Sequence, residues 1–179
     1  MKTAILLFLS GNFFLFIAGA FALFSRPRDS FRQRNKNSLW VAGSMLCLGW
    51  LVSKEFPLHL FESILGFAFL GISLLLFLWT AWINRRNKLT PIYSTDQPRY
   101  LMQSGPYQYI RHPYYSAYLL TFVGGGILSR SPWAYVILLL VLHIYTSAAD
   151  QEEEKFLNSP LAEAYRSYKK TTGKFFPYL

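Results

Sequence analysis

Two polar segments of the chain hold most of the side chains whose types and spacing could do chemistry. The first runs from Ser104 to Tyr115 and contains Arg111 and His112 among tyrosines and prolines. The second, Asp150 to Glu154, is a cluster of carboxylates. A guanidinium fork suits a carboxylate or a phosphate, and an imidazole offers a donor or an acceptor according to its tautomer. If the segments meet at one face of the protein, we expect a polar pocket there.

The rest of the chain is strongly apolar, with 53% hydrophobic and 18% aromatic residues among its 179. About 20 helical residues cross a hydrocarbon layer of about 30 Å, and several apolar runs are this long. We therefore predict an all-α, polytopic membrane protein with about five transmembrane helices in a single domain, residues 1–179. The predicted spans are residues 3–24, 39–56, 58–83, 114–129 and 132–149. A tight turn at Ser129–Pro132 separates the last two spans, because proline fits the start of the following helix.

The basic residues support this topology. Five spans place three segments on one side of the membrane, and each carries five Lys or Arg residues, 15 of the 18 in the chain. The positive-inside rule then predicts an N-terminus outside and a C-terminus in the cytosol. The net charge of +9 does not indicate nucleic acid as a partner, because the basic residues are scattered over three loops without a binding module. We expect a bacterial inner membrane, with the endoplasmic reticulum as the alternative.

The predicted fourth span begins beside the first polar segment. Pro113 suits the first turn of a helix, and a helix start favours an anion. Arg111 adds a cation at the same place, which indicates an anion site. The alternative is that Arg111, Tyr107 and Tyr109 anchor the helix end among lipid head groups, and the spacing alone does not decide between the two.

The acidic cluster predicts a further helix. Asp150 as N-cap with Glu153 three residues on is a variant of the capping box. We expect a cytosolic amphipathic helix over residues 151–170, able to pack on the membrane face or to cover a site. Three consecutive glutamates exceed what a cap requires, so two of them are predicted to face the Arg111-His112 segment and to hold a ribose diol or an ammonium group.

Two features lie inside the predicted spans. Gly124-Gly125-Gly126 predicts tight packing against the fifth span, or room for a ligand chain. His143 is predicted to hydrogen-bond a neighbouring helix, with a functional role as the alternative.

Five pieces of the sequence occur together in a recognisable order. They are Gly105-Pro106-Tyr107, Arg111-His112-Pro113-Tyr114-Tyr115, Glu153-Glu154-Lys155-Phe156-Leu157, Leu161-Ala162-Glu163-Ala164-Tyr165-Arg166-Ser167-Tyr168 and Pro177. From Arg99 onward the chain resembles the superfamily of isoprenylcysteine carboxyl methyltransferases and phospholipid methyltransferases, which are membrane enzymes.

The resemblance implies a cofactor, S-adenosylmethionine, bound without the GxGxxG loop of a Rossmann fold. It implies cofactor-binding roles for Arg99, Tyr100, Leu101, Met102, Tyr107, His112, Pro113, Tyr114, Tyr115 and Glu153. The methyl acceptor would be small or lipophilic and would enter from the membrane lipid at the cytosolic face. We predict catalytic roles for Arg111, His112 and Glu154. An amine or alcohol acceptor would need Glu154 or His112 as base, whereas a carboxylate or thiolate needs none.

One departure from the pattern concerns the substrate. In the carboxyl methyltransferases an arginine precedes the glutamate pair by about one helical turn, and this chain has Ala149 there. The departure weighs against prenylcysteine carboxyl methylation. Two alternatives stay open: an NADPH-dependent membrane reductase of the sterol reductase type, and a non-catalytic membrane scaffold. The pair Glu153-Glu154 favours the methyltransferase over the reductase.

Overall fold

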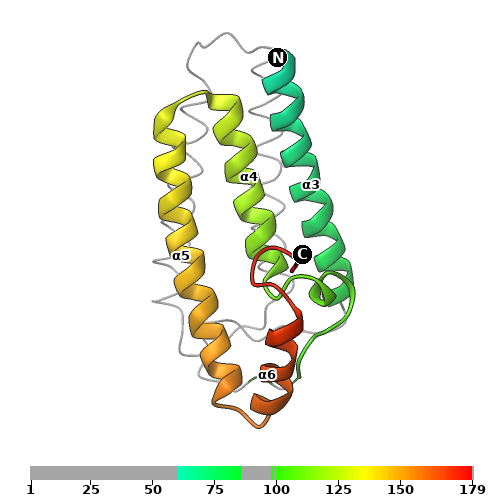
Figure 1. The fold of residues 1–179 in the computed structure, drawn as a ribbon. Coiled ribbons are helices and arrows are strands. Elements are labelled where there is room, and N and C mark those ends of the chain that lie inside the picture. The colour runs from blue at the N-terminus through cyan, green and yellow to red at the C-terminus, as the bar shows by residue number, and fades with distance from the viewer. Residues whose placement is uncertain (1–59, 86–97, 99, 179) are drawn as a thin grey trace.

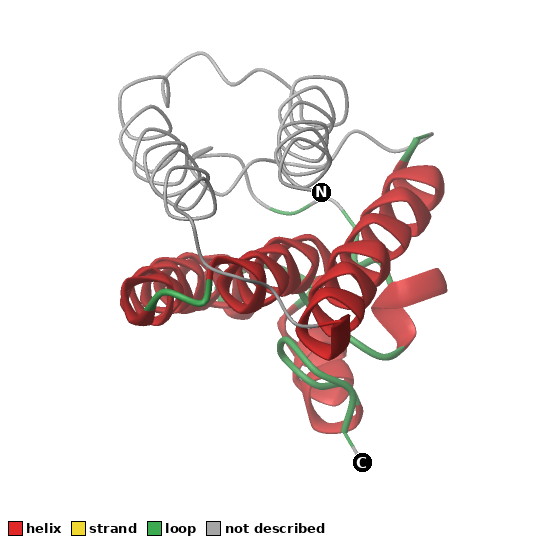
Figure 2. Cartoon of the chain, turned by 90° about the horizontal axis from the view of Figure 1, so that it is seen from above, coloured by secondary structure: helices red, strands yellow, loops and turns green. Residues whose placement is uncertain are grey.

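The computed structural model describes residues 60–85, 98 and 100–178. In this part of the chain all regular structure is helical (Figures 1 and 2). The elements are α3 (Leu60–Asn84), the short 3-10 helix η1 (Gly105–Gln108), α4 (Pro113–Ser129), α5 (Pro132–Leu157) and α6 (Ala162–Thr171). The predicted all-helical fold is therefore confirmed here. The predicted spans 3–24 and 39–56 lie outside the described residues.

Two of the described helices are long and apolar enough to cross a membrane. They are α3 and α5, with 25 and 26 residues and mean hydropathies of 2.3 and 1.6. The shorter α4 has 17 residues and lies between them, and most of its side chains are buried (Figure 1). The observed starts and ends of α3 and α4 lie within two residues of the predicted spans 58–83 and 114–129.

The turn between α4 and α5 occurs where the sequence predicts it. Arg130 ends α4 in the left-handed conformation, with φ of 50°, and Pro132 opens α5. The Arg130 Nε atom also lies 3.1 Å from the Glu62 carboxylate, so an ion pair connects the turn to the start of α3. A left-handed residue followed by a proline is a compact way to reverse the chain.

Small and hydroxyl-bearing residues bring α3 and α4 together. A β-carbon on Gly124 would lie 2.8 Å from the carbonyl oxygen of Gly66, so the two backbones nearly touch. The Ser73 hydroxyl donates to the Ala117 carbonyl at 2.6 Å and lies 2.7 Å from the Thr121 hydroxyl. Small residues permit such close approach between apolar helices. The glycine run thus packs on both sides: Gly124 faces α3, and a β-carbon on Gly126 would lie 3.7 Å from Ala134 of α5, the predicted fifth span.

The predicted helix over residues 151–170 is wrong in its start. The helix α5 continues through the acidic cluster to Leu157, and α6 begins at Ala162. Asp150 therefore lies inside α5, and its carboxylate accepts from Lys174 Nζ at 2.6 Å instead of capping a helix. Nothing in the sequence stops the helix before Asn158-Ser159-Pro160, where proline removes the backbone donor that a continuing helix needs.

The segment after α6 turns back to the start of α4 (Figure 1). The Arg111 and His112 amides donate to the carbonyls of Gly173 and Lys174 at 2.8 and 3.1 Å. Beyond them Phe175 enters the apolar core. Only glycine fits at position 173, because a β-carbon there would lie 1.7 Å from the Phe176 carbonyl oxygen. This return of the chain fixes the backbone of the first polar segment.

The close approach of α3 and α4 leads to a stability prediction. Gly124→Ala should lower the free energy of unfolding by about 2 kcal/mol, because the added methyl group meets the Gly66 backbone. Gly71→Ala is the matched control, since a β-carbon at Gly71 meets nothing within 4 Å. The control should leave stability unchanged or raise it by up to about 1 kcal/mol. Thermal unfolding in detergent measures both, and equal melting temperatures would contradict this packing.

Candidate active site

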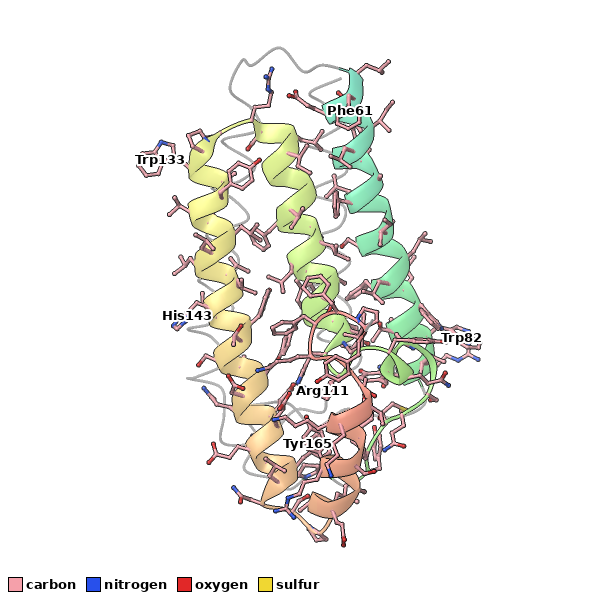
Figure 3. All side chains as sticks on the ribbon, in the orientation of Figure 1. Phe61, Trp82, Arg111, Trp133, His143 and Tyr165 are labelled. Carbon is pink, nitrogen blue, oxygen red and sulfur yellow. The ribbon has the colours of Figure 1, made fainter. Side chains whose placement is uncertain are left out.

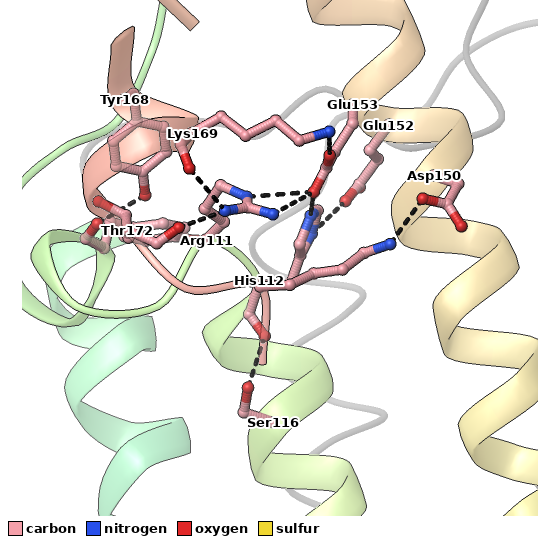
Figure 4. Close-up of polar contacts among 11 residues, drawn as sticks. Arg111, His112, Ser116, Asp150, Glu152, Glu153, Tyr168, Lys169 and Thr172 are labelled. Atoms are coloured by element: carbon pink, nitrogen blue, oxygen red, sulfur yellow. Dashed lines mark hydrogen bonds and ion pairs between the residues drawn. The ribbon is translucent and has the colours of Figure 1, made fainter. Parts of the chain in front are cut away.

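The two polar segments meet at one end of the helix bundle (Figure 4). Arg111, which precedes α4, places Nε and Nη2 each 3.1 Å from Oε1 of Glu153 on α5, 42 positions away in the chain. The Nε2 atom of His112 lies 3.3 Å from the same carboxylate oxygen. A single oxygen atom, Glu153 Oε1, thus connects Arg111 and His112 at the start of α4 to the end of α5.

Arg111 joins three parts of the structure. Besides Glu153, its Nη1 donates to the Lys169 carbonyl at 3.3 Å and to the Thr172 carbonyl. The side chain is buried, with 4% of its surface exposed, so these bonds form largely out of water. These bonds connect the start of α4 to α5 and to the end of α6, which is a positioning part; a catalytic role for Arg111 stays a prediction.

Glu153 is surrounded by cationic groups. Its second oxygen, Oε2, lies 2.7 Å from Lys169 Nζ on α6, while Oε1 faces Arg111 and His112. Buried carboxylates are stable only when such partners compensate for lost hydration. The next residue, Glu154, is exposed. Its carboxylate is not among those that contact His112, although the sequence suggested it as a base.

Glu152 is the second glutamate that faces the Arg111-His112 segment, so two of the three glutamates do so, as predicted. The Nδ1 atom of His112 lies 3.1 Å from Glu152 Oε2, and the imidazole ring stacks on Tyr115 at 5.6 Å between centroids. Tyr115 in turn stacks on Tyr145 of α5 at 5.0 Å. Burial by itself would lower the pKa of His112, but hydrogen bonds to Glu152 and Glu153 outweigh it and raise the pKa above the usual 6.5.

Tyr107 is held by buried hydrogen bonds to Asn84 and Tyr168. Asn84, the last residue of α3, donates from Nδ2 to the Tyr107 hydroxyl at 2.9 Å, and the Tyr168 hydroxyl donates to the Tyr107 carbonyl at 2.6 Å. Burial raises the pKa of Tyr107 well above its ordinary value, so the phenol stays neutral. These bonds hold η1 between α3 and α6.

The other predicted cofactor residues are spread around this centre. Pro113 and Tyr114 are buried in the first turn of α4. Tyr100, Leu101 and Met102 lie in irregular backbone before η1, where Tyr100 is exposed and the other two are partly buried. Arg99 lies outside the described residues. His143, on α5, is exposed and points away from α4 (Figure 3) rather than toward it, contrary to its prediction.

Sequence reasoning missed four contributors to this arrangement: Asn84, Tyr145, Glu152 and Lys169. Glu152 stood in the predicted acidic cluster, and the helical register decides which glutamate faces α4. Asn84 offered one weak signal, an amide at the end of an apolar run. For Tyr145 and Lys169 no local pattern distinguishes them from other aromatic or surface residues.

Ala149 has a clear packing role. It is fully buried and lies in one apolar cluster with Phe122, Tyr145 and Phe175. Phe175, from the C-terminal segment, belongs to the same cluster. The position that carries an arginine in the carboxyl methyltransferases is thus part of the apolar core in this chain.

The buried ion pairs lead to a second stability prediction. Arg111→Gln should lower the free energy of unfolding by about 3–5 kcal/mol, because it leaves Glu153 partly uncompensated in a buried position. Lys174→Gln removes the same charge from the more exposed pair with Asp150 and should cost less than about 1 kcal/mol. Chemical or thermal unfolding distinguishes them, and a similar cost for both would mean that the Arg111 cluster does not hold the fold.

The raised pKa of His112 leads to a pH dependence. A group whose folded pKa is raised contributes stability that is complete below its unfolded pKa, about 6.5, and is lost as the pH rises through the folded value. We expect the stability difference between the wild type and His112→Gln to be largest near pH 6 and to shrink toward about pH 9. Melting temperatures across this range measure it, and a difference that grows with pH would contradict the geometry.

Comparison with known proteins places this arrangement in a family. The family model for phospholipid methyltransferases matches residues 61–164, more than half of the chain and most of the site. The cobalt-zinc-cadmium resistance protein CzcN of Cupriavidus metallidurans is 30% identical over 161 residues, which are 87% of this chain and 69% of that protein. The nickel-cobalt-cadmium resistance protein NccN of Alcaligenes xylosoxydans xylosoxydans is 27% identical over 158 residues, covering 86% and 70%.

This finding confirms the resemblance that the motifs indicated. It supports an enzyme of the methyltransferase type, and together with the two long apolar helices it indicates a membrane protein. The chain belongs to the phospholipid methyltransferase family.

Proposed function

We propose that the protein transfers a methyl group from S-adenosylmethionine to a small or lipophilic acceptor at the cytosolic face of the membrane. One observation carries the proposal: the Arg111-His112 segment and the glutamates at the end of α5 form a single connected cluster. These are the segments to which the resemblance assigns the cofactor. Family membership supports the reaction class, while the cofactor and the acceptor are our proposal.

The side chains of the site suit the groups of this cofactor. S-adenosylmethionine carries a sulfonium and an ammonium cation, a carboxylate and two ribose hydroxyls. Glu152, with a quarter of its side chain exposed, can accept hydrogen bonds from an ammonium group or a ribose diol. Both neighbours of the Tyr115 ring are stacked side chains, His112 and Tyr145, so this ring orients His112 rather than offering a face to the sulfonium. When bound, the cofactor would supply a methyl group on positively charged sulfur: an acceptor lone pair would bond to the methyl carbon as the carbon–sulfur bond breaks, and the neutral thioether would leave.

The protein's part in such a reaction is mostly alignment. A methyl group on a sulfonium is already activated, so holding two reactants in line supplies much of the acceleration. The buried bonds of Arg111 and the stacked rings of His112, Tyr115 and Tyr145 give the site a fixed frame. A lipophilic acceptor is reasonable because exposed apolar side chains cover α3 and α5. Ala149 itself provides no cation for an acceptor carboxylate at the position where the carboxyl methyltransferases carry an arginine.

The alternatives differ in what they bind. An NADPH-dependent reductase is disfavoured by the family match, and a scaffold would bind neither cofactor. The relatives CzcN and NccN are named for metal resistance, and within the described residues no group of three or more His, Cys, Asp and Glu side chains is placed to hold a metal ion.

Calorimetry on the detergent-purified protein tests the proposal. We expect the wild type to bind S-adenosylmethionine and S-adenosylhomocysteine but not NADPH. His112→Gln should weaken both adenosyl ligands roughly tenfold, about 1.4 kcal/mol, because it removes a side chain at the centre of the site. The matched control is His143→Gln, which changes an exposed histidine on the outer face of α5.

The results separate the three functions. Binding of NADPH without the adenosyl ligands would place the protein among reductases, and binding of none of the three would leave the scaffold. If His112→Gln and His143→Gln weakened ligand binding equally, the cofactor site would not lie at the start of α4. Thermal unfolding of each variant ensures that folded proteins are compared.

A further inference from the structure

Both ring nitrogens of His112 face carboxylate oxygens. Nδ1 lies 3.1 Å from Glu152 Oε2, and Nε2 lies 3.3 Å from Glu153 Oε1. A neutral imidazole has one donor and one acceptor nitrogen, and an acceptor nitrogen facing a carboxylate is repelled. Only the imidazolium form donates to both oxygens. The geometry therefore describes a positively charged ring that bridges two neighbouring glutamates of α5.

The two glutamates are not equivalent partners. Glu153 is almost completely buried, and Arg111 and Lys169 hold both of its oxygens. Glu152 is partly exposed, and His112 is the hydrogen-bond partner of its carboxylate within the described part of the chain. Glu153 would thus keep its place if the ring moved, whereas Glu152 and the ring orient each other.

We propose that Glu152 is a positioning residue of the candidate active site, which holds the His112 ring charged and flat against Tyr115. No role for Glu152 follows from the motifs, since the pair that matches the family pattern is Glu153-Glu154. The inference rests on the proposed function for what the ring is positioned to do. It changes the chemistry expected of His112: a ring that donates from both nitrogens supplies charge and hydrogen bonds and does not accept a proton from an acceptor.

The charge of the ring depends on groups from every neighbouring element. From α5 come Glu152 and Glu153, which favour the charged ring. From the segment before α4 comes Arg111, and from α6 comes Lys169; both oppose the ring charge but are neutralised in part by Glu153. From the C-terminal segment comes Lys174, whose ammonium pairs with Asp150. Loss of the Glu152 charge therefore removes the one carboxylate that His112 does not share with these cations.

Histidine titration by NMR tests the proposal directly. The full-length protein in detergent is labelled with 13C in its three histidines. The His112 signal is the one that disappears in His112→Gln. In Glu152→Gln the midpoint of the His112 titration should fall clearly below that of the wild type. Glu154→Gln removes the same charge from the exposed neighbouring position and should move the midpoint far less. An unchanged midpoint in Glu152→Gln, or equal shifts in both variants, would overturn the proposal.

A binding measurement connects the ring to function. We expect Glu152→Gln to weaken binding of S-adenosylhomocysteine several-fold, with the largest loss between the two titration midpoints, where the wild-type ring is charged and the variant ring is neutral. The control is Glu163→Gln, an exposed position at the start of α6. Wild-type affinity in Glu152→Gln at every pH would overturn the positioning role. If the wild type binds no adenosyl ligand while the midpoint still falls, the proposed function fails and the contact between Glu152 and His112 stands.

Discussion

The described structure depends on one shared carboxylate. Glu153 accepts from Arg111, His112 and Lys169, and so connects the start of α4, the end of α5 and α6 at one point. Ion pairs of this kind are a poor source of net stability, because removing the charges from water costs several kcal/mol for each. Such pairs contribute structural specificity instead, because a helix shifted by one turn would leave buried charges without partners. The cluster thus selects one register of α5 against α4.

The sequence predicted this architecture where the local pattern is strong. The starts of α4 and α5 follow from Pro113 and Pro132, and the apolar run before Asn84 gives α3 its length. The start of the C-terminal helix was mispredicted because Asp150 and Glu153 satisfy a capping pattern that an unbroken helix can also contain. A capping residue acts only where the backbone has already stopped being helical, and the stop lies ten residues later, at Pro160.

The candidate site was predictable in its segments and not in its individual contacts. Arg111 was identified as a cation beside a helix start, and the resemblance to the methyltransferases assigned His112 and Glu153 to the cofactor. The choice of Glu152 over Glu154 depends on how far α5 is rotated about its axis, and that rotation is set by the packing of Ala149 and Tyr145 against α4. Lys169 enters through the return of the chain along α6, a long-range arrangement that no local window contains.

The turn at Arg130–Pro132 lies at the opposite end of the bundle from the charged cluster. On one side of it, α3 and α4 are locked together by Gly66 and Gly124 with little room to slide. About 30 Å of α5 separates Pro132 from Glu152, because a helix rises 1.5 Å per residue. A tilt of only about 4° at the turn would therefore displace the glutamates by about 2 Å. The ion pairs of Glu153 with Arg111, His112 and Lys169 thus fix α5 at the end where a small tilt would have its largest effect.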